Sequence, residues 1–124
     1  MYNLSEFIDT WQNEKNYSWE SFWLMFGSFL DLYYLKKDPA MFAKKPSYND
    51  NVPIQIRAFI DAATDYLLRD STPPAWVKNP DNTLEEPFFP SSLKGAIRAI
   101  MLIESPVEFK VRNIYVTHDV LTRA

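Results

Sequence analysis

The sequence predicts an all-α protein of about four or five helices, and two observations lead to this fold class. The apolar residues of 19–34 recur at the spacing of one helix face, and several other segments repeat the same period behind a helix-capping residue. A length of 124 residues fits one domain, 1–124, without disulfides or a structural metal. The inward side of the 19–34 helix is expected to hold Trp19, Phe22, Trp23, Phe26, Phe29, Leu30 and Tyr33.

The N-terminal part of the chain predicts two consecutive helices. Asn3 and Glu6 are spaced as a capping box, so we expect a first helix that runs to about Lys15. Ser18 is the expected N-cap of the aromatic helix, which continues to about Lys37. The first helix is expected to turn inward Leu4, Phe7, Ile8 and Trp11.

The middle of the chain predicts one more helix between two irregular segments. Residues 38–52 lack a sustained period and are interpreted as a surface connection. Pro53 is expected at the first turn of a third helix. Residues 71–90 hold five of the nine prolines, yet they also carry Trp76, Phe88 and Phe89, so this long irregular segment should be pinned onto the helices. The third helix is expected to turn inward Ile56, Phe59, Ile60, Ala63 and Leu67.

The C-terminal part predicts two shorter helices. Ser91 or Ser92 is expected to cap a helix that stops near Glu104. The run Ser105-Pro106-Val107-Glu108 has the pattern of an N-cap, a first-turn proline and a capping-box Glu, which predicts a short fifth helix reaching 113. Residues 114–116 are β-branched or aromatic and fit either a small strand or an extended tail. The fourth helix is expected to turn inward Leu93, Ala96, Ile97, Ile100 and Met101.

Composition excludes several classes of function. There is no Cys and one His, so a metal site is not expected, and the two glycines form no phosphate-binding loop, so no cofactor is expected either. The net charge of -3 and the scattered Lys and Arg do not indicate nucleic-acid binding. No leader peptide or membrane span is expected, which favours a cytoplasmic protein with a protein partner, and a homo-oligomer is compatible with this.

One motif near the C-terminus could carry chemistry. Arg112 and His118 are spaced similarly to the Arg and His of HEPN domains, which are small all-helical dimers that include metal-independent ribonucleases. In such a pair His moves a proton of the 2′-hydroxyl and Arg stabilises the charge on phosphate. Residues six apart on a helix lie about 120° out of phase, so the two side chains would not share a helix face. A surface Arg and a solvated His explain the same residues.

A second resemblance covers the C-terminal half of the chain. The segments PAWV (74–77), LEEPFF (84–89), SPVEFKVRNIYV (105–116) and LTRA (121–124) resemble a family of small uncharacterised bacterial proteins. Members of that family resemble the partners of putative nucleotidyltransferases in toxin–antitoxin-like gene pairs. The resemblance therefore implies a partner-binding or neutralising role, and it does not require a His at 118.

These observations favour a non-enzymatic interaction protein that binds a separately encoded nucleotidyltransferase-like partner, antitoxin-fashion. Lys110, Arg112 and Asn113 are the expected recognition surface, because they form the one concentrated cationic patch of an acidic chain. An Arg112 that satisfies carbonyl groups at the end of its own helix is the competing interpretation. The alternative function is an HEPN-like ribonuclease that uses Arg112 and His118.

Overall fold

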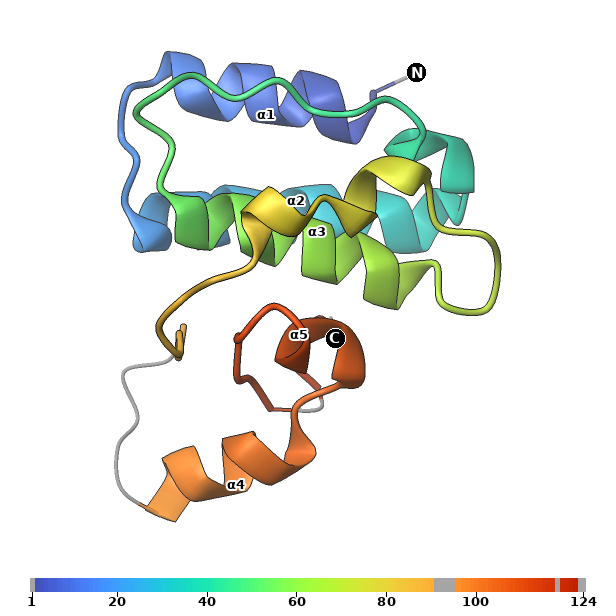
Figure 1. Ribbon diagram of the computed structural model, residues 1–124. Coiled ribbons are helices and arrows are strands. Elements are labelled where there is room, and N and C mark those ends of the chain that lie inside the picture. The colour runs from blue at the N-terminus through green and yellow to red at the C-terminus, as the bar shows by residue number, and fades with distance from the viewer. Residues whose placement is uncertain (1, 91–95, 118, 123–124) are drawn as a thin grey trace.

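The computed structural model describes residues 2–90, 96–117 and 119–122. Over these ranges the chain is all-α, as predicted (Figure 1). None of the helices in the described part of the chain combines the length and apolar character that crossing a bilayer requires. The described elements are the α-helices α1 (Leu4–Asn13), α2 (Trp19–Lys36), α3 (Ile54–Leu67), α4 (Ala96–Glu104) and α5 (Val107–Lys110) and the 3₁₀ helices η1 (Pro39–Phe42), η2 (Ala75–Lys78) and η3 (Pro80–Asn82).

Helices α1 and α2 begin at the residues that the sequence predicts. The Asn3 side chain accepts a hydrogen bond from the Glu6 amide at 2.9 Å, and the Ser18 hydroxyl accepts one from the Ser21 amide at 3.2 Å. Each bond satisfies an N–H group that has no partner within its own helix. Both helices end within two residues of the predicted positions.

The aromatic residues of α2 form the centre of the core, as predicted. The rings of Phe22 and Phe26 stack with their centroids 5.1 Å apart, and Phe59 of α3 meets each of them edge-on at 6.1 Å. Phe7 of α1 packs on the other side, 5.9 Å from Phe26. The other members of the predicted face are buried or half-buried: Trp19, Trp23, Phe29, Leu30 and Tyr33.

The connection 38–52 begins with buried structure, so its interpretation as a surface connection is wrong there. The Asp38 side chain accepts a hydrogen bond from the Ala40 amide and caps η1. This turn directs Met41 and Phe42 into the core, where the Phe42 ring lies 4.9 Å from that of Tyr33. A short 3₁₀ turn has too few residues to show a helical period in the sequence.

Helix α3 lies at the centre of the molecule. Pro53 takes the N-cap position, one residue before the predicted place. Every residue from 58 to 65 is buried, because α3 contacts α5, η2 and η3 in addition to the aromatic rings of α2. The predicted inward residues are buried or, for the last of them, half-buried: Ile56, Phe59, Ile60, Ala63 and Leu67.

Residues 71–90, called the strap below, run along α3 and then towards the C-terminal helices (Figure 1). The Trp76 indole N–H donates to the Phe42 carbonyl at 3.0 Å. The ring of Phe88 lies edge-on to Trp19 at 5.5 Å, and that of Phe89 stacks on Tyr115 at 5.5 Å. The predicted pinning by Trp76 and the two phenylalanines is confirmed.

Helix α4 stands apart from α1, α2 and α3 in Figure 1. Its predicted caps, Ser91 and Ser92, and the predicted core residue Leu93 lie outside the described residues. Met101 is 2% exposed, as expected of an inward residue, whereas Ile100 is 46% exposed. The prediction that Ile100 faces the core is therefore wrong, since neighbouring residues on a helix point about 100° apart and Met101 takes the inward position.

Ser105 does not cap α5, so the predicted capping box with Glu108 is wrong. Pro106 takes the N-cap position and provides no side-chain cap. The Ser105 side chain is buried, and its hydroxyl donates to the Ile114 carbonyl and accepts from the Val116 amide, both at 3.2 Å. The returning chain occupies the position in which a capping bond would form.

Residues 114–116 form an extended segment rather than a named strand. A single parallel bridge joins Ile114 to Phe88 of the strap. It consists of the Phe88 amide donating to the Asn113 carbonyl at 3.0 Å and the Tyr115 amide donating to the Phe88 carbonyl at 2.9 Å. Of the two alternatives that the sequence leaves open, the extended tail is the one observed.

Candidate functional site

Arg112, the centre of the predicted recognition surface, lies in the interior and is 5% exposed. Its Nη2 donates to Asp65 Oδ2 on α3 at 3.2 Å and to the Val77 carbonyl of the strap at 2.6 Å. Its Nη1 donates to the carbonyl of Glu108, so part of the competing interpretation, an Arg bonded within its own helix, is confirmed. This burial conflicts with a partner contact, because the guanidinium joins three segments of its own chain.

Lys110 and Asn113 also bind their own chain. Lys110 Nζ donates to the Ile103 carbonyl of α4 at 2.9 Å, and Asn113 Nδ2 donates to the Leu84 carbonyl of the strap at 3.2 Å. Asn113 has a φ of 66°, a left-handed conformation that Asn tolerates better than most residues and that directs the chain into the extended tail. Both residues are half-buried. Their predicted role at a partner stays a prediction.

The Arg112 and His118 pair cannot be assembled from the described residues, because His118 lies outside them. Arg112 has a structural role, since its guanidinium donates hydrogen bonds to a carboxylate and to two carbonyl groups. Residues 114–117 are not helical, in agreement with the expectation that the two residues do not share a helix face. The ribonuclease alternative gains no supporting geometry here.

The sequence interpretation missed two buried carboxylates one turn apart on α3. Asp61 and Asp65 are 1% and 7% exposed. Asp65 pairs with Arg112, and Asp61 Oδ2 accepts a hydrogen bond from Asn82 Nδ2 of η3 at 2.8 Å. Burial raises the pKa of the Asp61 carboxyl to about 6. The detectable signal was two aspartates four residues apart inside an otherwise apolar helix.

The C-terminal helices carry a set of exposed aliphatic side chains, called the C-terminal apolar face below. Their exposed fractions range from 46% to 78%. They follow one another closely in sequence, from the outer side of α4 to the end of α5. The C-terminal apolar face consists of Ile100, Leu102, Ile103, Val107 and Val111.

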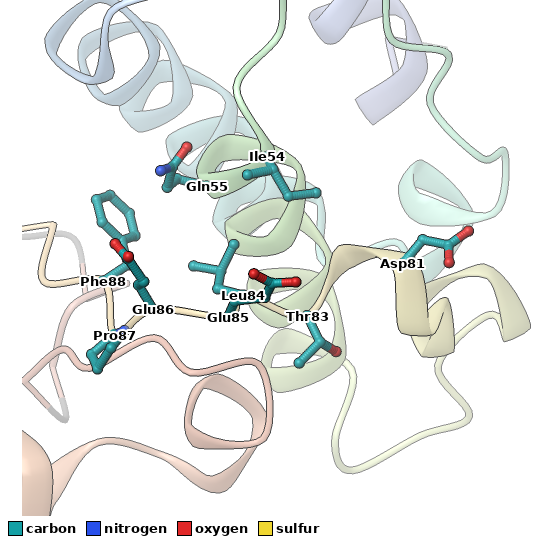
Figure 2. A pocket seen from close by; sticks show the side chains of 9 residues that line it. All are labelled: Ile54, Gln55, Asp81, Thr83, Leu84, Glu85, Glu86, Pro87 and Phe88. Atoms are coloured by element: carbon teal, nitrogen blue, oxygen red, sulfur yellow. The ribbon is translucent and has the colours of Figure 1, made fainter.

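A second feature of the surface is a groove between the first turn of α3 and the strap, called the acidic groove below (Figure 2). Its volume is about 430 Å³. The strap supplies three exposed carboxylates, and α3 supplies one apolar and one amide side chain on the opposite side (Figure 2). The groove is lined by Ile54, Gln55, Asp81, Thr83, Leu84, Glu85, Glu86, Pro87 and Phe88.

The described residues contain no group of three His, Asp or Glu side chains that could hold a metal ion. The two surfaces described above differ in the chemistry of their side chains: aliphatic groups on the C-terminal apolar face, and carboxylates in the acidic groove. Comparison with protein-family models, with curated proteins and with solved structures finds no match to this chain.

Proposed function

We propose that this chain is a non-enzymatic interaction module that binds another protein through the C-terminal apolar face. Following the resemblance of residues 74–124, the proposed partner is a separately encoded nucleotidyltransferase-like protein, bound in the manner of an antitoxin. The observation that carries the proposal is that Met101 of α4 is buried, while Ile100, Leu102 and Ile103 of the same helix are 46%, 47% and 78% exposed.

The composition of α4 supports this proposal. Seven of the nine residues in AIRAIMLIE are apolar, and the two charged residues are Arg98 and Glu104. With Met101 buried, Ile103 points about 200° away around the helix, and Ile100 and Leu102 lie about 100° to either side. A helix at a protein surface normally turns mostly charged and polar side chains outward, whereas α4 exposes three aliphatic side chains.

Helix α5 and the residue after it carry two further exposed aliphatic side chains. Val107 and Val111 are four residues apart, so they lie on the same side of the helix, and they are 63% and 59% exposed. Burying one such aliphatic side chain completely contributes roughly 1.5–3 kcal/mol. Covering the whole face would offset a substantial part of the entropy that two proteins lose when they associate.

The test compares one isoleucine of the C-terminal apolar face with one leucine outside it that is equally exposed. Ile103 of α4 and Leu24 of α2 are both 78% exposed. We expect Ile103→Glu to weaken binding to the protein encoded by the neighbouring gene by about 100-fold or more, because a charge would be buried without a partner. Leu24→Glu, the matched control, should bind as the wild type does. Affinity would be measured by titration calorimetry after co-expression and separate purification.

Three results would overturn the proposal. The first is equal affinity of Ile103→Glu and the wild type for the neighbour-encoded protein. The second is a wild-type homodimer in light scattering that Ile103→Glu converts to a monomer, which would assign the face to a second copy. The third is RNA cleavage by clean wild-type protein that His118→Ala abolishes, which would establish the ribonuclease alternative.

A further inference from the structure

The floor of the acidic groove is apolar and firmly placed. Leu84 is 8% exposed, and its amide donates to the Arg112 carbonyl at 3.2 Å. Phe88 is half-buried against Trp19, and its backbone N–H and C=O groups both form hydrogen bonds with the extended tail. Across the groove, Ile54 is 39% exposed on the first turn of α3. A ligand in this groove would therefore meet aliphatic and aromatic carbon on a surface that is already packed.

The charged groups on the rim are all carboxylates. Asp81 sits on η3 at one end of the groove, and Glu85 and Glu86 follow it along the strap (Figure 2). All three side chains are exposed, and none of them forms an ion pair with another described residue. No Lys or Arg is among the lining residues. Among its described lining residues, the groove therefore presents negative charge without a Lys or Arg, above an apolar floor.

This combination fits one type of side chain closely. Lys and Arg place an aliphatic stem along apolar surface while their charged group stays at the polar edge. A guanidinium can also bond a carboxylate bidentately and stack on an aromatic ring. We propose that the acidic groove is a docking site for a basic segment of a protein partner, with an Arg or Lys stem on Ile54 and Phe88 and its charge at Glu85 and Glu86.

The proposed docking site is independent of the C-terminal apolar face. The two surfaces share no residue, and they differ in chemistry, since one would bind through aliphatic packing and the other through charge. Normal binding of the neighbour-encoded protein by Ile103→Glu would overturn the proposed function but would not bear on the acidic groove. The groove is tested with a synthetic probe, so its outcome does not depend on the identity of the neighbour-encoded protein.

The probe is a fluorescein-labelled peptide in which Arg alternates with Ala, and binding is followed by fluorescence anisotropy at low and at physiological ionic strength. Two comparison peptides carry Lys or uncharged citrulline in place of Arg. We expect the Arg peptide to bind more tightly than the Lys peptide and the citrulline peptide to bind weakly or not at all. Added salt should weaken the binding of both charged peptides.

Variants separate the groove from the overall negative charge of the protein. Glu85→Gln/Glu86→Gln should weaken binding of the Arg peptide about tenfold, since two exposed charge pairs are lost. The matched control is Glu14→Gln/Asp70→Asn, which changes the net charge equally at exposed sites outside the groove and should bind nearly as the wild type does. Ile54→Ser should weaken binding several-fold without changing its salt dependence.

A measurement on the wild type provides a check that needs no variant. Addition of the Arg peptide should shift the amide resonances of 54–55 and 81–88 in a ¹⁵N correlation spectrum more than those of the other elements. Equal weakening by the two double variants, equal binding of the citrulline peptide, or resonance shifts confined to other regions would each overturn the proposal.

Discussion

The helical body (α1, α2 and α3) and the C-terminal region (α4, α5 and 111–122) place their apolar residues differently. In the body the large side chains pack on one another, as in the cluster of rings around Phe26, and the two strongly exposed leucines lie eleven residues apart on α2. In the C-terminal region five aliphatic side chains of two short helices remain on the surface. The body buries most of its large apolar side chains, whereas the C-terminal region leaves these five exposed, and they form the surface that we propose for a partner.

The two regions are also attached to each other by a mixture of apolar and polar contacts. Phe109 of α5 is completely buried and its ring lies 5.4 Å from Phe59 of α3. Beside this contact, Arg112 pairs with the buried Asp65. A buried ion pair contributes little net stability compared with apolar side chains of similar size, so we expect this one to fix the position of the C-terminal region more than its stability.

The largest expected effect is in the body. Phe26→Ala should lower the free energy of unfolding by about 4 kcal/mol, because it removes a fully buried ring that packs on several others. Thermal and urea unfolding would measure the change. Leu24→Ala, on the exposed side of the same helix, is the control and should stay within about 0.5 kcal/mol of the wild type. A decrease of only a few degrees in the melting temperature of Phe26→Ala would contradict the placement of Phe26 in the core.

A somewhat smaller loss is expected at the attachment of the two regions. Arg112→Ala should destabilise by about 3 kcal/mol, since it leaves the buried Asp65 carboxylate with only the exposed Lys78 as a cationic partner. Lys78→Ala removes the other cation near Asp65 and should cost less than about 1 kcal/mol, because its side chain is 69% exposed. Urea unfolding of both variants measures the difference.

The double variant Arg112→Ala/Asp65→Ala gives a sharper test of the attachment. If the loss comes from the unpaired carboxylate, the double variant should be less destabilised than the sum of the two single variants. Additive losses would show that Arg112 contributes through packing instead of through the ion pair.

The fold was largely predictable because its main elements carry local signals. The helical period and the caps at Asn3 and Ser18 are local properties of the chain, and the structure repeats them closely. The interpretation failed where a residue finds a distant partner. Ser105 has the sequence environment of a helix cap, yet its hydroxyl bonds the chain nine and eleven residues later. Gln12 likewise forms hydrogen bonds with the backbone of the 38–52 connection, and no local sequence pattern predicts such a contact.

The candidate surfaces were less predictable, for a related reason. A basic patch around Arg112 is visible in the sequence, but its burial depends on Asp65, which is 47 residues away. The composition of α4 was visible as well, but a run of apolar residues does not reveal which side will be covered. The acidic groove needs residues 54–55 and 81–88 together, and these two segments are far apart in the sequence.

The two buried carboxylates of α3 also differ from each other, because only Asp65 is paired with a residue of the C-terminal region. Asp65 has a cation beside it, whereas Asp61 has the amide of Asn82 as its hydrogen-bond donor. Desolvation is the largest influence on Asp61 and raises its pKa to about 6, the bond from Asn82 and the charges of Arg112 and Lys45 lower it, and Asp65 raises it further. The protonated form of Asp61 is thus favoured by folding.

Asp61 should therefore make the stability of the protein depend on pH. Its folded-state pKa of about 6 lies above its ordinary value of 3.8, so the folded protein binds the proton more tightly between these values. The contribution of Asp61 is complete below pH 3.8 and is lost as the pH rises through 6. Asp61→Asn cannot ionise and keeps an oxygen for Asn82. The free energy of unfolding of Asp61→Asn, measured in urea relative to the wild type, should therefore increase by about 2–3 kcal/mol from acidic to neutral pH. A stability difference between Asp61→Asn and the wild type that stays constant with pH would contradict the raised pKa.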